Sequence, residues 1–530
     1  MKQHSLSFVI YHLSFIISHL SFSVVLCVAL TSCSLDETPS SELPESAAYT
    51  SSESLYLNTV ATLYNYIGGY QDGQGLQGPS RGIYDLQTFG SDEAMLPLRG
   101  GDWYDGGLWE AMYKHSWAAG HDLVKNAWLY LYKVITLCNI SLETLDTYKD
   151  LAGINSYNQW TAEVRALRAM YYWYLIDLFG DVPLVTNSSV SMNEVKREKR
   201  AEVFKFCEEE LISVINFLEP EIKSNHEGDY YGRITQPVAY FILAKLMLQS
   251  EVYTGVPRWE DCISYCDELK IVDYSLEPIY SSNFFVYNQN SKENIFTIPM
   301  DKNLFSNQQQ NIIRSLHYRH AAAYGYGGEN GTCATLKALQ VFGYPDDIDP
   351  RFIDCYHYSY VYGPDGEPIT DRTGKPLKYE PDKVQLDLSG SPYVETAGAR
   401  MYKYQFDKNA IKDGKLVDND IVLFRYADVL LMRADCKVHL GKDGSADFNA
   451  VRARAGAKKR ACTLDNILDE RLLELCWEGW RRPDLIRFNR YKSLYEGLDA
   501  VDESDGHTTV FPIPADVRAL NQNLTQNPGY

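Results

Sequence analysis

Apolar residues at the spacing of an α-helix limit, more than any other feature, what this chain can fold into. The clearest stripe covers residues 160–179, ends at Gly180, and consists of Val164, Leu167, Tyr171, Tyr174, Leu175 and Leu178. Helices are expected in further segments as well: 202–218, 235 to about 253, 423–440, 446–455 and 464–479. A period near 3.6 residues indicates amphipathic helices. The sequence therefore predicts an all-α, helix-rich scaffold and argues against a parallel α/β enzyme.

The chain's 530 residues suffice for several domains or for one large unit of stacked helices. Val203 and Pro237, near the starts of two expected helices, are 34 residues apart, which is the period of a tetratricopeptide repeat. The full repeat signature is missing. Tetratricopeptide-like helix pairs are thus a hypothesis that this spacing favours without establishing it.

A long segment without sustained periodicity, about residues 271–416, interrupts the helices. It is rich in Gly, Pro, Asp and Tyr, and the turn sequences GPDG (363–366) and DRTG (371–374) lie between short strand-like runs. Such turns predict small hairpins. Irregular excursions mounted on a rigid frame often carry function, so we expect this insert to carry part of a binding surface.

The N-terminal segment predicts export. Residues 8–30 are mostly apolar, and the sequence LTSC that ends at Cys33 resembles the lipobox of bacterial lipoproteins. We therefore expect a signal peptide at 1–32, lipidation of Cys33 and a flexible tether over 33–48. An uncleaved membrane helix over residues 8–30 is the alternative. The body then divides into an N-terminal helical region, 49–270, and a C-terminal region, 271–530, that contains the insert.

Charge and cysteine content exclude some classes of protein. Fifty Lys and Arg against seventy Asp and Glu give a net charge of −20, and a surface this acidic repels phosphate backbones. No nucleic-acid partner is expected. The eleven cysteines include no CxxC motif, so a disulfide framework is not indicated. Cys207, Cys436 and Cys476 fall on apolar positions and are interpreted as small buried hydrophobic residues.

Motifs for catalysis are missing from the sequence. It contains no HExxH, no P-loop and no GxSxG, and His317 and His320 lack an acidic ligand at a recognised spacing. No catalytic residue, cofactor or metal is predicted. The charged cluster of residues 469–484 could place Arg471 beside Glu474 and Glu478 beside Arg482 on a helix. We interpret it as a structural clamp rather than a catalytic site.

The best binding candidate is the segment RGGDWYDGGLW, residues 99–109. Its four glycines make a poor core element, and exposed Trp rings are costly unless a ligand covers them. A sugar suits this composition, because its C–H face stacks on an indole while polar groups bond its hydroxyls. Trp109 is expected to be buried. The residues expected to contact glycan here are Arg99, Asp102, Trp103, Tyr104 and Asp105.

A second loop of similar composition, YGYGGENG, spans residues 324–331. Tyr324, Tyr326 and Asn330 are its candidate glycan-binding residues, and His317, Tyr318 and His320 could flank it. With 40 Tyr in the chain, a Tyr-rich core is the alternative interpretation.

Several segments, in the same order along the chain, resemble the SusD/RagB family, the surface glycan-binding lipoproteins of Bacteroidetes. Besides the lipobox, they are RGGDW (99–103), LFGDVPLV (178–185), GRIT (232–235), RYADVLL (425–431), FNAVRARAG (448–456), DER (469–471), EGWRR (478–482), PIP (512–514) and QNPGY (526–530).

The resemblance implies an all-α fold with tetratricopeptide-like helix pairs and no catalytic activity. It also implies a lipid anchor in the outer membrane that faces outward, a polysaccharide or oligosaccharide ligand, and a SusC-like TonB-dependent transporter as partner. Glycans of the family lie on an aromatic arc built from loops, to which Trp103 and the 324–331 loop would correspond. Glu329 stands where related proteins often have Trp, which suggests a narrower arc or a different sugar.

Two other functions remain open at this point. Seventy carboxylates could include the pair that a surface glycoside hydrolase needs. Alternatively, the helix pairs could form a protein-interaction solenoid that grips a partner without contacting sugar.

Overall fold

The computed structural model describes residues 48–69, 73–220, 228–271, 274–305, 307–491 and 503–530. Ser51–Tyr530 form one compact unit. The expected signal peptide, Cys33 and nearly all of the tether lie outside the described residues. Of the helices that are described, none is both long and apolar enough to cross a membrane.

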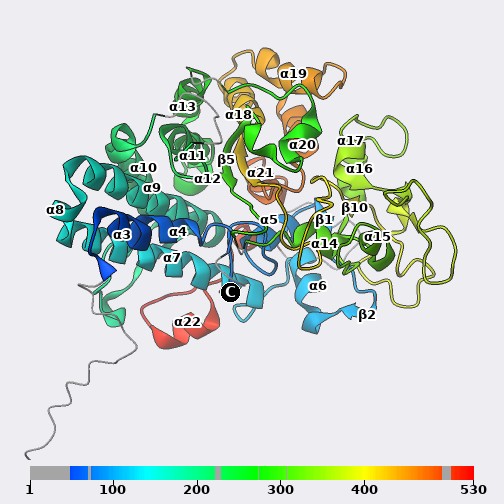
Figure 1. Ribbon diagram of the computed structural model, residues 1–530, viewed down its shortest axis with the longest axis horizontal. Helices are drawn as coiled ribbons and strands as arrows, with labels where there is room; N and C mark the ends of the chain where they lie inside the picture. Colours follow the sequence, from blue (N-terminus) through cyan, green and yellow to red (C-terminus); the bar gives the residue numbers. More distant parts are fainter. Residues whose placement is uncertain (1–47, 70–72, 221–227, 272–273, 306, 492–502) are drawn as a thin grey trace, which may run out of the picture. The chain divides into compact units, whose positions relative to one another are not determined.

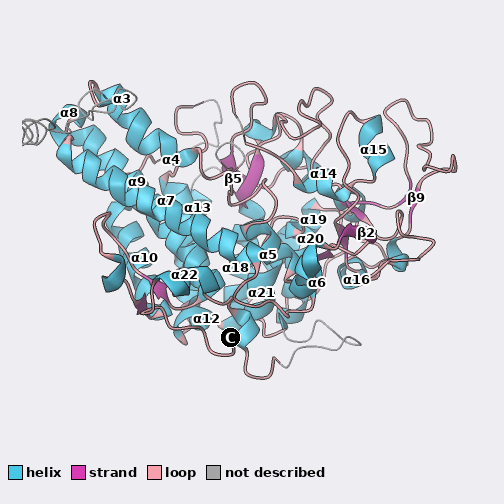
Figure 2. Ribbon diagram, turned by 90° about the horizontal axis from the view of Figure 1, so that it is seen from below, coloured by secondary structure: helices cyan, strands magenta, loops and turns pink. Residues whose placement is uncertain are grey.

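The fold is helix-rich, as the periodicity predicts (Figures 1 and 2). A π-helical turn, Leu57–Ala61, joins the first two helices of the unit. The helices up to residue 271 are α3 (Ser52–Tyr56), α4 (Thr62–Tyr64), α5 (Ile83–Phe89), α6 (Leu108–Tyr113), α7 (Asp122–Thr147), α8 (Lys149–Ala152), α9 (Ile154–Phe179), α10 (Arg200–Val214), α11 (Gln236–Leu248), α12 (Ser250–Thr254) and α13 (Trp259–Ile271). Those that follow are α14 (Asn311–Ser315), α15 (Tyr318–Ala323), α16 (Leu336–Val341), α17 (Phe352–Cys355), α18 (Tyr426–His439), α19 (Ser445–Arg454), α20 (Leu464–Leu475), α21 (Arg481–Arg487) and α22 (Ala515–Leu520).

Strands are short and pair two by two in antiparallel fashion, and β2 (Gly100–Trp103) forms a tight hairpin with its own flank. The pairs are β1 (Ala94–Met95) with β6 (Cys333–Ala334), β3 (Val182–Pro183) with β4 (Arg197–Glu198), β5 (Asn294–Ile298) with β11 (Ile421–Arg425), β7 (Tyr356–His357) with β10 (Arg400–Met401), and β8 (Ser359–Tyr360) with β9 (Lys378–Tyr379).

The long helix α9 is the centre of the N-terminal helices. Gly153 and Gly180, both with positive φ, border it at its two ends, which is the usual role of glycine at a helix C-terminus. Nearly all of its second half is buried, because α7 packs along one side and α10 along another. Figure 2 shows α7 and α9 side by side. The predicted stripe over residues 160–179 is thereby confirmed.

One predicted helix begins later than the sequence suggested. Residues Ile421–Arg425 form strand β11, and helix α18 starts only at Tyr426. All five residues of β11 are buried against β5. A continuous apolar run fits a buried strand as well as a buried helix, so the period alone could not separate the two.

The insert contains the expected hairpins. Backbone bridges join Tyr362 with Pro368 and Thr370 with Pro376 around the two predicted turns, and Gly366 and Gly374 have φ of 82° and 84°. These glycines allow the left-handed conformation that the turns need. Figure 1 shows the yellow insert loops near β2 and α6, away from α3 and α8.

The division of the body at residue 270 stays a prediction.

The C-terminal charged cluster is a buried structural network, as predicted, but its pairs differ from those expected. Arg471 binds Asp428 and Asp484, each at 2.7 Å, instead of Glu474. Glu478 binds Arg425 at 2.8 Å, and Arg482 donates to backbone and phenol oxygens. These side chains point into the core, where a charge must be fully paired. They therefore bind partners from other elements of the fold instead of the neighbours expected on the same helix.

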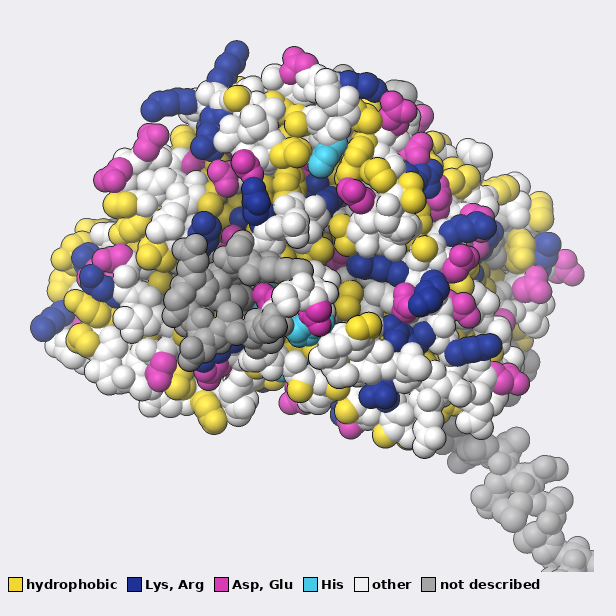
Figure 3. Space-filling model, turned by 180° about the vertical axis from the view of Figure 1, so that it is seen from behind, with side chains coloured by type: hydrophobic (Ala, Val, Ile, Leu, Met, Phe, Trp, Pro, Cys, Tyr) yellow, Lys and Arg dark blue, Asp and Glu magenta, His cyan; other side chains and the backbone are white. Residues whose placement is uncertain are grey.

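The thiols agree with the sequence interpretation. Cys207, Cys436 and Cys476 are buried free thiols. On the face drawn in Figure 3, acidic and basic side chains are interspersed. This face therefore offers no continuous basic surface to a nucleic acid.

Glu93, which precedes β1, gives a testable pH dependence. Burial raises the pKa of its carboxyl to about 7, although the backbone N–H of Trp477 donates to it. Because the folded state holds this proton more tightly than the unfolded state, stability falls as pH rises from about 4.5 to 7. Glu93→Gln removes this titration. In denaturant titrations between pH 5 and 8, we expect the variant to gain stability relative to wild type as pH rises. A pH-independent difference would contradict the assignment.

Candidate functional site

The loop over residues 99–107 has an unusual backbone. All four of its glycines have positive φ, and so do Trp103 (68°) and Asp105 (41°). Residues with side chains avoid this region at a cost of about 1–3 kcal/mol each, and such strain persists only where surrounding contacts enforce it. Contacts with the rest of the protein must therefore hold the backbone of this loop.

Arg99 anchors this loop from inside the protein. It is only 5% exposed, and its guanidinium donates to the carbonyls of Val394 and Ala397 at 2.8 and 2.9 Å. Burial lowers its pKa to about 9. Its backbone exchanges two hydrogen bonds with that of Asp102. Arg99 thus supports the loop from beneath. Its contact with glycan stays a prediction.

Asp105 fastens the other end of the loop. Its carboxylate accepts hydrogen bonds from Arg81 and from the indole of Trp109, both at 2.8 Å. Trp109 is 2% exposed, so the expectation that it belongs to the core is confirmed. Arg81 also lies within 5.5 Å of the Trp109 ring.

Trp103 lies half-buried against the second predicted loop. Its indole N–H donates to the carbonyl of Glu329 at 3.0 Å. Its ring packs so closely on Gly331 that a Cβ there would lie 2.7 Å from the ring atom Cε2. The glycine is required at this position because any side chain would displace the indole. Together these contacts hold one edge of the ring.

A polar rim continues from Trp103 toward the insert. The phenol of Tyr318 donates to Asp102 at 3.1 Å, and partial burial, together with Asp102, raises the Tyr318 pKa. Arg372 lies 4.7 Å from the Tyr318 ring centroid and 3.4 Å from Glu395. We call Asp102, Trp103, Tyr318, Arg372 and Glu395 the Trp103 surface. It combines two aromatic faces with hydrogen-bonding groups of both signs.

The second predicted loop lies mostly beneath this surface. Tyr324 is half-buried and stacks on Phe406 with ring centroids 4.3 Å apart. Tyr326 is buried at 5% exposure, and Asn330, 2% exposed, accepts a hydrogen bond from Arg400 at 2.8 Å. The structure brings this loop against Trp103 but turns Tyr326 and Asn330 inward. Ligand contact by these three residues stays a prediction.

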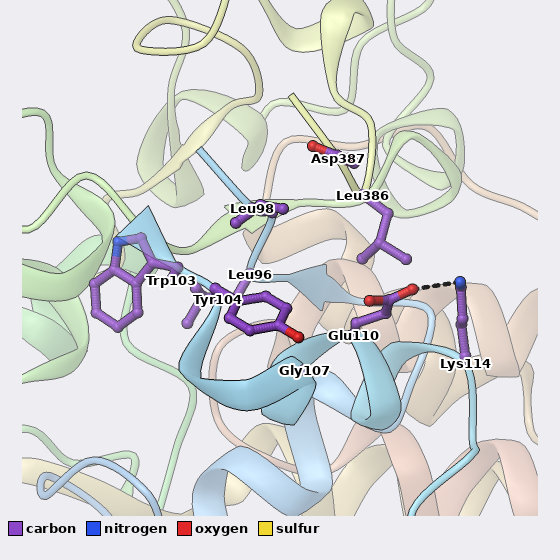
Figure 4. A pocket seen from close by; sticks show the side chains of 9 residues that line it. All are labelled: Leu96, Leu98, Trp103, Tyr104, Gly107, Glu110, Lys114, Leu386 and Asp387. Carbon is purple, nitrogen blue, oxygen red and sulfur yellow. Dashed lines mark hydrogen bonds and ion pairs between the residues drawn. The ribbon is translucent and has the colours of Figure 1, made fainter. Parts of the chain in front are cut away.

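Tyr104, the next residue after Trp103, points to a separate pocket of about 210 Å³. Its ring is 58% exposed. Figure 4 shows the Trp103 indole pointing away from Glu110 and Lys114, whereas the Tyr104 phenol points toward Glu110. We call this the Tyr104 pocket, and its lining residues are Leu96, Leu98, Trp103, Tyr104, Gly107, Glu110, Lys114, Leu386 and Asp387.

The insert forms one wall of the Tyr104 pocket. Leu98 bridges to the segment around Asp387 through two backbone hydrogen bonds, 2.9 Å to the carbonyl of Leu386 and 2.8 Å from the N–H of Leu388. Glu110 and Lys114, four residues apart on α6, form an ion pair of 2.5 Å at the rim. The hairpin thus directs consecutive aromatic residues to two different sites.

Sequence reasoning did not single out Arg372, Glu395 or Leu386. They lie in the insert, more than 260 residues after Trp103 in the sequence, and no local pattern marks them. Tyr318 was recognisable only as a neighbour of the second loop. These residues come to lie near Trp103 and Tyr104 only because the insert folds over β2.

Two family models match the chain. One, described as the SusD family, matches residues 292–530. The other, described as starch-binding and associating with the outer membrane, matches residues 81–248. The starch-binding protein SusD of Bacteroides thetaiotaomicron is 27% identical over 459 residues, which cover 78% of this chain and 80% of that protein. A SusD-like protein of Bacteroides ovatus is 24% identical over 88% of this chain and 81% of its own length.

Solved structures share the fold. A laminarin-binding SusD-like protein superposes with a TM-score of 0.70 at 21% identity and covers 91% of this chain and all of that one. Surface glycan-binding protein A from Bacteroides thetaiotaomicron, solved with laminarihexaose, has a TM-score of 0.70 at 20% identity, covering 90% of this chain and all of that one. These neighbours have a helical, tetratricopeptide-like fold, which confirms the predicted fold class. Since both family models describe SusD-type proteins and together span most of the described residues, the chain belongs to the SusD/RagB family.

Proposed function

We propose that this chain is a non-catalytic, cell-surface lipoprotein that captures oligosaccharide or polysaccharide at the Trp103 surface. It would then deliver the glycan to a SusC-like TonB-dependent transporter. In this proposal Cys33 carries the lipid that anchors the protein in the outer membrane, facing outward. The names of the relatives support carbohydrate binding, and one family description includes association with the outer membrane.

The fixed position of Trp103 is the observation that carries the proposal. A sugar ring stacks best on an aromatic face that is already oriented, because little side-chain entropy is then lost on binding. The hydrogen bond to the Glu329 carbonyl and the close contact with Gly331 supply this orientation. Asp102 and Glu395 can accept hydrogen bonds from sugar hydroxyls, and Arg372 can donate them. The groups of this surface are suited to binding a saccharide, and the proposed function does not require them to cleave a bond.

The test is a titration of lipid-free protein, residues 34–530, with a broad panel of polysaccharides by isothermal titration calorimetry. At least one glycan is expected to bind and to raise the melting temperature, since a ligand of the folded state stabilises it. Failure to bind any glycan would count against the proposal and leave the interaction solenoid. Release of reducing sugar from a bound glycan would identify a hydrolase instead.

Delivery is tested separately in outer membranes. The full-length protein is expected to co-purify with a large TonB-dependent barrel, whereas a Cys33→Ala protein is expected to be absent from the outer membrane because it lacks the lipid. A Cys33→Ala protein that still reaches the outer membrane would refute the lipid assignment.

A further inference from the structure

Beyond the Trp103 surface, the Tyr104 pocket has the size of a single sugar unit. Pockets for drug-sized ligands measure about 300–1,000 Å³, and the Tyr104 pocket, at about 210 Å³, is smaller than that range. An extended glycan chain therefore does not fit inside, but one ring does. Backbone hydrogen bonds join Leu98 to Leu386 and Leu388, so these segments form one continuous wall. A pocket that holds a single ring favours the last unit of a chain or branch.

The walls of the pocket match the two sides of a pyranose. Leu96, Leu98 and Leu386 supply an apolar wall, and Tyr104 adds an aromatic face that is 58% exposed. Such surfaces suit the C–H face of a sugar. The rim offers Asp387 together with the ion pair of Glu110 and Lys114, which can bond the hydroxyls at the ring edge.

The charge at the rim selects against acidic sugars. Glu110 and Asp387 contribute two carboxylates, whereas Lys114 contributes one ammonium group that is already paired with Glu110. The chain as a whole carries a net charge of −20. A carboxylated or sulfated unit would meet repulsion at close range, and the lining residues offer no unpaired cation to offset it.

The position of the pocket connects it with the Trp103 surface. Cα atoms of consecutive residues are about 3.8 Å apart, and Trp103 itself lines the pocket edge. A glycan that stacks on Trp103 therefore lies beside the pocket.

We infer that the Tyr104 pocket is a subsite for one uncharged, non-reducing terminal monosaccharide unit, either the end of a chain or a one-unit branch, of the glycan held at the Trp103 surface. This inference rests on the proposed function, and it specifies the ligand as a neutral glycan with an accessible terminal unit. The unit is joined to the rest of the glycan through its C1 atom, which must point out of the pocket.

The probes are methyl glycosides of glucose, galactose, mannose and xylose, with methyl glucuronide as the charged counterpart, each at about 10 mM, where weak single-unit binding is detectable. Binding is followed by saturation-transfer NMR. We expect a signal from at least one neutral glycoside and none from the glucuronide. Leu386→Phe, which fills the pocket, is expected to reduce the signal by about fivefold or more. Phe217→Ala, at an exposed ring that lines neither site, is expected to leave it unchanged.

Leu98→Phe is a second blocking variant in case Leu386→Phe folds poorly, as judged by its melting temperature. The inference is overturned if no neutral glycoside gives a signal, if neither folded blocking variant reduces it, or if the glucuronide binds equally well. These outcomes are distinguishable from failure of the proposed function. If polysaccharide binds but no methyl glycoside does, only the subsite is refuted. If a methyl glycoside binds but no polysaccharide does, the Trp103 surface is refuted as the glycan-binding site.

A linear and a singly branched oligosaccharide with the same neutral backbone distinguish the two sources of a terminal unit. Tighter binding of the branched compound to wild type, with the difference abolished by Leu386→Phe, identifies a branch. Equal binding of the two, weakened in both cases by Leu386→Phe, identifies a chain end. Equal binding that Leu386→Phe leaves unchanged overturns the inference.

Discussion

Glu474→Gln is expected to lower the free energy of unfolding by about 3–5 kcal/mol, because it removes a buried carboxylate that three buried arginines share. The Glu474 carboxylate is fully buried and binds Arg351 at 2.9 Å, Arg425 at 2.5 Å and also Arg454. These arginines come from the insert, from strand β11 and from helix α19. One carboxylate thus ties three parts of the fold to α20. Denaturant unfolding of the variant and wild type measures the loss.

Glu209→Gln is the matched control, since Glu209 pairs with Lys205 at 3.8 Å on the exposed side of α10, where the side chains are 67% and 64% exposed. It should cost no more than about 0.5 kcal/mol. A Glu474→Gln loss as small as this would show that the network does not support the fold.

Acid unfolding provides a second readout for Glu474. Burial alone would raise its pKa, but Arg454, Arg425 and Arg351 outweigh this effect and hold the pKa well below its usual value. A depressed pKa stabilises the folded state above the unfolded-state pKa near 4.3, and this contribution is lost as pH falls further. Wild type should therefore lose stability on acidification below about pH 4.5, and the Gln variant should lose less.

How far the sequence predicts the fold depends on whether a signal is local. The helix over 160–179 is recognisable because its stripe, its length and Gly180 all agree. Strand β11 is not recognisable, because its five consecutive residues are all buried and show no alternation of buried and exposed positions. The charged cluster is recognisable as a clamp from its composition. Its partners are not, because Arg471 reaches Asp428 only through the packing of α18 against α20.

The candidate site shows the same division. Trp103 and Tyr104 stand out in the sequence because rings next to several glycines make a poor core element. Arg99 and Asp105 hold the loop through hydrogen bonds and an ion pair with residues outside it. These structural roles could not be predicted from the sequence, because the partners are brought close only by the fold. Arg372 and Glu395 are ordinary charged residues of an irregular insert. Only the fold of the insert over β2 brings them beside Tyr318.

Trp103→Ala is expected to weaken binding of the cognate glycan by about 1–3 kcal/mol, or roughly 5- to 150-fold in Kd. The indole supplies the largest aromatic face of the Trp103 surface, and its edge is fixed by the hydrogen bond to Glu329. The melting temperature should change little, because the ring is only half-buried. Calorimetric titration measures the affinity, and thermal unfolding confirms that the variant is folded.

Gly331→Ala tests the orientation of the ring separately from its presence. A Cβ at residue 331 would lie 2.7 Å from Cε2 and 2.8 Å from Cζ2 of Trp103, so the indole must move and its hydrogen bond to Glu329 must weaken. We expect a loss of about threefold or more in affinity although the indole is retained. Phe217→Ala is the control, because this ring is 52% exposed at the end of α10, in a different part of the sequence. If Phe217→Ala weakened binding as much as Trp103→Ala, or if both Trp103 and Gly331 variants bound like wild type, glycan would have to bind elsewhere on the protein.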